Sequence, residues 1–97
     1  MQFEWDEAKN QRDLARHKIS FETAKSVFDD PWQLSVQDRV VDGEERWQTL
    51  GIVSGIVVLV AHTWDEDDSA QVMRLISARK ATARERRVYA ENKNEPG

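Results

Sequence analysis

Few side chains in this sequence can move a proton near neutral pH. Besides the lysines and carboxylates, they are His17, His62 and Tyr89, because arginine stays protonated in proteins. We expect His62 where a strand ends, either as a proton-transfer residue or as a strand-end histidine paired with Asp65 or Glu66. We interpret His17 as structural, because an imidazole at a helix end satisfies free carbonyl groups.

Basic side chains concentrate near the end of the chain. Residues 74–89 hold six basic residues and one acid, a local charge of +5, whereas the whole chain carries −4. The six are Arg74, Arg79, Lys80, Arg84, Arg86 and Arg87. This asymmetry predicts a cationic working face for a polyanion on an acidic body. The alternative is a solvated helix that the arginines simply decorate.

Two of these residues are the first choice for binding a phosphate. Arg79 and Lys80 are expected between the last strand and the terminal helix, where Arg79 could bind two phosphate oxygens. Arg46 opens an earlier strand and could project onto the same sheet face as Arg74. The alternative for Arg46 is an exposed ion pair with its acidic neighbours, which stabilises little.

Aromatic side chains offer a second kind of contact. Trp5, Trp32 and Trp47 have apolar neighbours and are expected in the core, whereas Trp64 shares a strand side with His62 and could stack on a base. Tyr89 in the terminal helix could donate a proton or stack, although a helical tyrosine is more often part of the core.

The elements that position these residues follow from periodicity. Residues 2–5 alternate as a first or edge strand, and Asp6 caps a helix over 7–17 whose apolar stripe is Ala8, Leu14 and Ala15. Ser20 caps a second helix that ends before Pro31.

After Pro31 the pattern alternates, which predicts strands near 32–36, 46–53, 56–61 and 71–77. Residues 56–61 are apolar on both faces and should form the central strand. Thr82 and Glu85 form a capping box for a terminal helix that runs to about residue 92, and residues 94–97 should fray. The fold class is therefore α+β, with an N-terminal strand, two helices, a four-stranded antiparallel meander and a C-terminal helix.

Length and composition limit the alternatives. Ninety-seven residues without cysteine predict one domain over 1–97 that contains no disulfide. The start of the chain lacks a signal-peptide pattern, and the longest apolar run is too short to cross a bilayer, so we expect a cytoplasmic protein without membrane contact. The acidic run at 65–68 lacks the spacing of a calcium loop, and no metal or cofactor is expected.

Several segments together carry a family resemblance. They are residues 3–10 (FEWDEAKN), 16–22 (RHKISFE), 27–31 (VFDDP), 45–47 (ERW), 50–51 (LG) and 76–89 (ISARKATARERRVY). In this order and spacing the chain resembles the BrnT-type toxins over nearly its whole length. One departure is Lys18, where the family commonly has a glycine, because a left-handed helix end costs more for a lysine.

The resemblance implies a RelE-like fold and a ribonuclease toxin that needs no metal. It also implies inhibition by a BrnA-like antitoxin with a ribbon-helix-helix domain, and binding of operator DNA only through the toxin–antitoxin complex. For such chemistry we predict a catalytic set and a smaller RNA-binding set. The catalytic set is Arg79, His62, Arg46, Lys80 and Tyr89, and the RNA-binding set is Arg74, Trp64 and Arg84.

Two other functions fit the residues. The first is a module that binds its antitoxin or nucleic acid without chemistry, which the small number of proton-transfer residues allows. The second is a metal-dependent nuclease that uses the acidic run. A DNA-binding regulator acting alone is disfavoured, because the sequence has no helix-turn-helix or ribbon signature.

Overall fold

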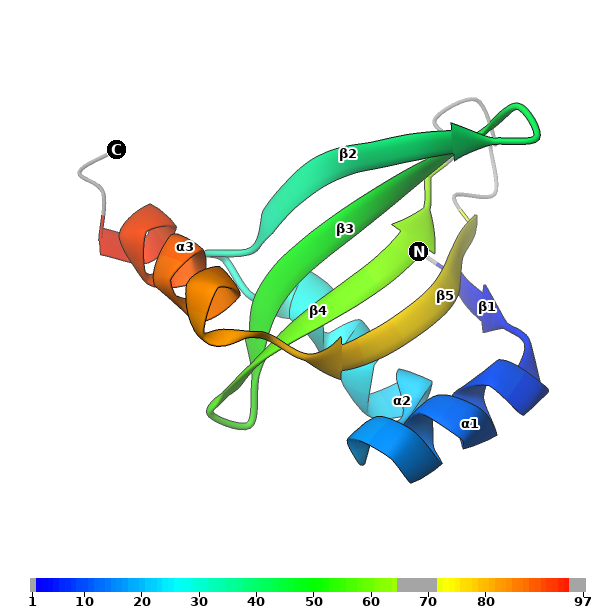
Figure 1. Cartoon of the computed structure of the whole chain (residues 1–97), viewed down its shortest axis with the longest axis horizontal. Helices are drawn as coiled ribbons and strands as arrows, with labels where there is room; N and C mark the ends of the chain where they lie inside the picture. Colours follow the sequence, from blue (N-terminus) through cyan, green and yellow to red (C-terminus); the bar gives the residue numbers. More distant parts are fainter. Residues whose placement is uncertain (1, 65–71, 95–97) are drawn as a thin grey trace.

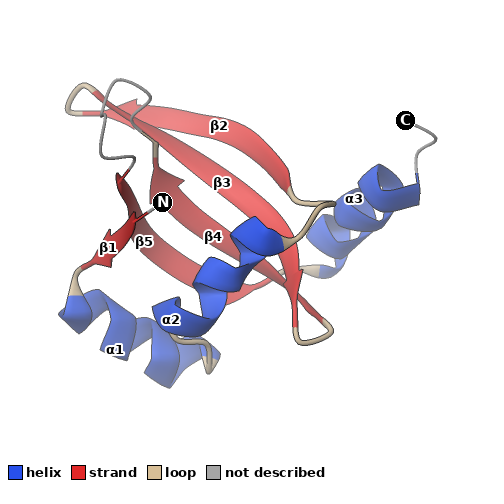
Figure 2. Ribbon diagram, turned by 180° about the vertical axis from the view of Figure 1, so that it is seen from behind, coloured by secondary structure: helices blue, strands red, loops and turns tan. Residues whose placement is uncertain are grey.

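A computed structural model describes residues 2–64 and 72–94 of the chain. Its elements, in order, are β1 (Gln2–Trp5), α1 (Glu7–His17), α2 (Phe21–Ala24), a 3-10 helix (Lys25–Asp29), β2 (Leu34–Val41), β3 (Glu44–Val53), β4 (Ile56–Thr63), β5 (Val72–Lys80) and α3 (Ala83–Asn94). One sheet carries helices α1 and α2 on one side and α3 near one end (Figures 1 and 2). The predicted α+β class is confirmed.

The sheet contains one strand more than the predicted meander. Strands β2 to β5 pair antiparallel in chain order, and β1 joins β5 in parallel, so the order is β1-β5-β4-β3-β2. The sheet is therefore five-stranded and mixed rather than a separate four-stranded meander. Strand β4 lies at its centre, as its two apolar faces predicted.

Two tight turns set the register of the meander. Asp42–Gly43 joins β2 to β3, and Ser54–Gly55 joins β3 to β4. All four residues have positive φ, which is the type I′ geometry that matches the twist of paired strands. Consequently Trp47 lies opposite His62 across β3 and β4.

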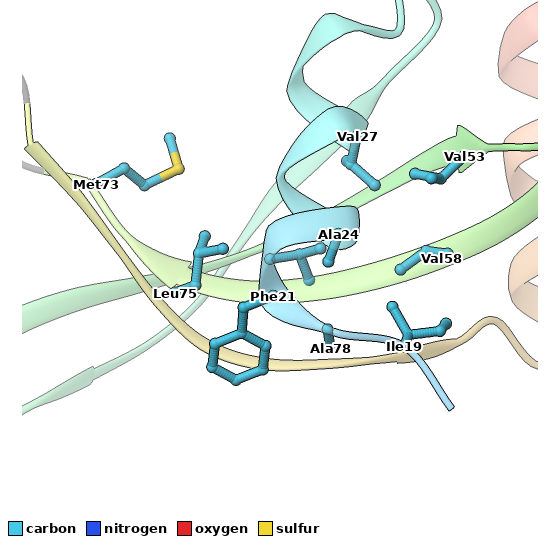
Figure 3. Packing of buried hydrophobic residues seen from close by; sticks show 10 residues of the cluster. Ile19, Phe21, Ala24, Val27, Val53, Val58, Met73, Leu75 and Ala78 are labelled. Atoms are coloured by element: carbon cyan, nitrogen blue, oxygen red, sulfur yellow. The ribbon is translucent and has the colours of Figure 1, made fainter. Parts of the chain in front are cut away.

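The core lies mainly between the sheet and α2. Figure 3 shows Phe21, Ala24 and Val27 of the helical segment against Val58 and Leu75 of the sheet. A smaller cluster on the opposite face holds α3 against β3 and β4. It consists of Leu50, Leu59, Ala81 and Tyr89.

Helix α1 contacts the sheet through polar residues, so the predicted apolar stripe was wrong. Ala8, Leu14 and Ala15 are exposed, whereas Asn10 and Asp13 are buried. Asn10 Oδ1 accepts a hydrogen bond from Phe21 N at 2.8 Å, and Asp13 Oδ2 accepts one from Ala78 N at 3.0 Å. These backbone groups would otherwise be buried without a partner, which explains the polar contact face.

The predicted N-terminal caps of the helices are confirmed. Asp6 and Ser20 each accept hydrogen bonds from the first turn of the helix that follows. At α3, Glu85 N donates to Thr82 Oγ1 at 3.2 Å and Thr82 N donates to Glu85 Oε1 at 2.8 Å, which is the reciprocal capping box. The second helix is shorter than predicted, because its α-helical part ends at Ala24 and a 3-10 helix continues to Asp29.

The predictions for the tryptophans and for two polar segments have mixed outcomes. Trp32 is 46% exposed, so its placement in the core was wrong, whereas Trp5 packs against Phe21. The acidic run 65–68 lies outside the described residues, as does most of the tail expected to fray; Asn94 ends α3. Over 2–64 and 72–94, no helix combines the length and apolarity needed to cross a membrane.

Candidate active site

A cationic pocket lies where the end of α1 meets the junction of β5 and α3. Its volume is about 460 Å³. Its lining residues are Arg16, His17, Lys18, Arg79, Lys80 and Thr82. The structure thus joins the predicted phosphate-binding pair, Arg79 and Lys80, to three basic residues from the other end of the sequence.

The position of α1 explains this meeting. Strand β1 covers the edge of β5 only from Val72 to Leu75, and further along that edge Asp13 accepts the Ala78 N–H. Helix α1 therefore runs beside β5, with its last turn near Lys80. The helix ends at Lys18, whose φ of 62° turns the chain and whose N–H donates to Leu14 O.

Arg79 is held by Glu85 of α3. Two guanidinium nitrogens donate to the carboxylate at 2.8 and 3.0 Å, and one also donates to Lys80 O at 3.2 Å. The hydrogen bonds from Arg79 are the largest cause that lowers the pKa of Glu85 to about 2, and the pKa of Arg79 is raised by the same pair. A guanidinium has five N–H donors, so within the described residues Arg79 keeps Nε–H and one Nη2–H uncommitted.

The sheet face that carries α3 holds two further arginines. Residues that lie opposite one another in a ladder share a face. Arg79 lies opposite Leu59, whose side chain packs on the α3 side, and Arg46 lies opposite Thr63, four residues further along β4. Both arginines therefore project on the α3 side, and their positions along β4 differ by about 13 Å. A bulge in β5 between Leu75 and Ser77 shifts the alternation, so Leu75 faces the core like Ala78 and Arg74 faces the α3 side. The structure therefore brings Arg46 and Arg74 to one end of this face and keeps them apart from Arg79.

The two arginines differ in their partners. Arg74 forms an ion pair with Glu44, with both side chains partly exposed. Arg46 Nε is buried and has no hydrogen-bond partner among the described residues. The predicted pairing of Arg46 with its acidic neighbours is therefore replaced by a pairing of Glu44 with Arg74.

His62 lies on the opposite face of the sheet, under the 3-10 helix. It is 4% exposed, and its ring stands at 90° to the Phe28 ring with 5.0 Å between centroids. Burial is the largest cause that lowers the pKa of His62, which favours the neutral ring. Nδ1–H then donates to Thr63 O at 3.0 Å and Nε2 accepts from the Thr49 hydroxyl at 2.7 Å, a tautomer assigned from these partners.

The remaining predicted site residues are dispersed. Tyr89 is 3% exposed and its hydroxyl donates to Asp30 Oδ2 at 2.6 Å; burial first, then Asp30, raises the pKa of Tyr89 to about 12. Trp64 lines a hollow of about 340 Å³ on the His62 side of the sheet, away from the arginines. Arg84 is exposed in the first turn of α3.

Sequence reasoning missed the contribution of α1. The three consecutive basic residues Arg16, His17 and Lys18 were visible, but no local pattern connects them to Arg79, which lies 62 positions later. The described residues contain no group of three or more histidine, cysteine or acidic side chains placed to hold a metal ion.

Comparison with known proteins agrees with the sequence resemblance. Residues 5–85 match the model of a family described as a ribonuclease toxin, BrnT, of type II toxin-antitoxin systems. The matched region includes α1, β5 and Glu85, and hence all the lining residues of the cationic pocket. A search of curated proteins found no match.

Proposed function

We propose, from the premise that this chain belongs to the BrnT family of ribonuclease toxins of type II toxin–antitoxin systems, that it cleaves RNA without a metal ion. The observation that carries the proposal is the cationic pocket, in which Arg79 is fixed by Glu85 with donors to spare. A positive group fixed in advance is what a phosphoryl transition state requires.

The reaction needs no group beyond those that RNA and protein supply. The 2′-oxygen attacks the neighbouring phosphorus and loses its proton to a base, while the bond from phosphorus to the 5′-oxygen breaks and that oxygen gains a proton. The products are a 2′,3′-cyclic phosphate and a free 5′-hydroxyl. Arg79 and Lys80 stabilise the negative charge that develops on the phosphorane oxygens.

In this proposal Arg46 and Arg74 bind the strand away from the cleaved bond. They share the open sheet face with Arg79 but lie about 13 Å from it along β4, too far to touch the same phosphate. Arg46 is half-buried, and no hydrogen bond among the described residues engages its guanidinium, so the accessible part of that group remains for an RNA phosphate. His62 and Tyr89 shape the fold in this proposal rather than transferring protons.

The test is cleavage of bulk RNA by the purified chain in excess chelator. We expect the parent to cleave and Arg79→Ala to lose a factor of about 10²–10³ in rate. Arg39→Ala, which removes an exposed arginine from β2, the edge strand that β3 and β4 separate from β5, is the matched control and should cleave like the parent. Circular dichroism verifies that each variant is folded.

The other outcomes select other functions. Full activity of Arg79→Ala would contradict the assigned site. Activity that chelator abolishes and Mg²⁺ restores would indicate a metal-dependent nuclease. A folded parent that binds RNA with steep salt dependence but leaves it intact would indicate a non-catalytic binding module.

The family also implies a protein antitoxin. We propose a BrnA-like partner with a ribbon-helix-helix domain that neutralises the toxin in the cytoplasm, where uninhibited cleavage would stop translation and growth. Operator DNA is bound only through that partner. A gel-shift experiment should show no shift with the toxin alone and a shift with the complex, and a shift by the toxin alone would contradict this arrangement.

A further inference from the structure

His17 is the histidine that the fold places beside the phosphate-binding residues. It ends α1, is half-buried and lines the cationic pocket. The charged groups that face the same pocket are Arg16 and Lys18 from α1 and Arg79 and Lys80 from β5. Within the described residues no hydrogen bond engages its ring, so its nitrogens are available to a ligand.

His62, Tyr89 and Glu85, three other groups that can transfer a proton, are occupied by partners of their own. Both ring nitrogens of His62 are hydrogen-bonded on the opposite sheet face, and the Tyr89 hydroxyl is buried against Asp30. Glu85 accepts from Arg79 and from the backbone of Thr82. Among the described residues, His17 is therefore the only imidazole that a phosphate held by Arg79 could approach.

We propose that His17 is a catalytic residue that accepts the proton of the attacking 2′-hydroxyl. This inference rests on the proposed ribonuclease function and adds the missing base to it. The bond from the 2′-oxygen to phosphorus forms as the proton passes to the imidazole. The bond to the 5′-oxygen breaks, and that oxygen takes a proton from water.

The structure gives His17 the rigidity that this role needs. Two hydrogen bonds hold α1 in place. Ala78 N of β5 donates to Asp13, and Phe21 N at the start of α2 donates to Asn10. The left-handed turn at Lys18 then fixes where the helix stops. A base positioned by packed backbone is held ready for the transition state.

The experiment compares His17→Gln with the parent on a short RNA in chelator. We expect kcat to fall by about 10²–10⁴, with KM changed by no more than about threefold, because the phosphate-binding residues remain. Affinity for the same oligonucleotide with a 2′-deoxy group at the cleaved position should be unchanged. Lys9→Gln removes a cation from α1 outside the pocket and should behave like the parent.

Two further readouts separate chemistry from folding. The pH profiles of kcat for the parent and for His17→Gln should differ, because only the parent carries an imidazole in the pocket. Added imidazole should restore part of the activity of His17→Ala. A His17→Gln variant with the kcat and the pH profile of the parent would overturn this inference, while a loss of rate in Arg79→Ala would still support the ribonuclease. A folded parent without activity would overturn both.

Discussion

At the scale of single residues, the Arg79–Glu85 pair joins the proposed site to the stability of the fold. Glu85 caps α3, and its pKa lies at about 2 against an ordinary value of 4.5, with the Arg79 hydrogen bonds as the largest cause. A carboxylate with a lowered pKa contributes stability above its unfolded value and loses that contribution as the pH falls through its folded value. The relevant window is therefore about pH 4.5 to 2.

We predict that the parent loses stability across this window and that Glu85→Gln loses less. The amide cannot titrate, so the slope from this position disappears, although the variant starts from a lower stability at neutral pH. Urea denaturation at a series of pH values measures the difference. Parallel curves for the two proteins would show that the pair does not couple protonation to folding.

The hydroxyl of Thr49 is a second residue-scale test. It is fully buried and contacts both His62 Nε2 and the Ser35 hydroxyl at 2.7 Å. Thr49→Val preserves shape but leaves these polar atoms without their partner, so we predict a loss of about 1–3 kcal/mol in the free energy of unfolding. Thr63→Val is the comparison, because the Thr63 group that holds His62 is the backbone carbonyl and, among the described residues, the Thr63 hydroxyl accepts only a long hydrogen bond, 3.4 Å, from Arg74 N.

The sequence predicted part of the site and not the rest, for a physical reason. The sequence allowed Arg46 and Arg74 to share one sheet face, but alternation alone leaves the register between their strands open, and the pairing of both strands with β4 fixes it. The role of His17 depends on where α1 lies, and α1 is positioned by the long-range bond from Ala78 N to Asp13. No local spacing reports such a bond.

At the scale of elements, the end of α1 carries backbone strain. Lys18 adopts φ of 62°, a conformation that costs an L-residue about 1–2 kcal/mol and glycine little. We predict that Lys18→Gly raises the free energy of unfolding by about 1 kcal/mol after the added chain entropy is counted. Lys18→Ala removes the same charge but keeps the strained backbone, so it should not raise the free energy of unfolding. If Lys18→Ala stabilised the protein as much as Lys18→Gly, the gain would come from the lost charge and not from relief of strain.

The contact between β3 and the 3-10 helix leaves no room for a side chain at Gly51. A Cβ there would lie 2.7 Å from Val27 Cγ1 and 3.0 Å from the Val27 carbonyl oxygen. We predict that Gly51→Ala destabilises by about 1–3 kcal/mol, because the helix must shift. The double variant Gly51→Ala, Val27→Ala should recover part of this loss, and full additivity of the two changes would contradict the close approach.

Elements with a repeating pattern were predicted better than their contacts. Strand alternation and the helix caps identified nearly every element, because these signals are local. The contact face of α1 was wrong, since Asn10 and Asp13 are buried by pairing with distant backbone N–H groups rather than by hydrophobicity. Trp32 was misplaced because it precedes an edge strand whose outer residues face solvent.

At the scale of the whole molecule, net charge is a poor guide to the position of the proposed RNA-binding site. The chain carries −4, yet Arg16, Lys18, Arg79 and Lys80 converge on one pocket. If all four neutralise phosphates of a single strand, log affinity should fall with log salt at a slope of roughly −3. Lys80→Gln should reduce that slope by about 0.7, measured with a non-cleavable oligonucleotide, and Lys9→Gln should leave it unchanged.

The pocket is assembled from two segments whose positions in the chain differ by 62 residues, from His17 to Arg79. At ordinary rates of protein synthesis, about 3 to 12 seconds separate the appearance of these residues on the ribosome. A nascent chain stopped before Arg79 would carry the proposed base without the residues proposed to bind the phosphate. The proposed site is therefore incomplete for a few seconds in each round of translation, however early the N-terminal part of the chain folds.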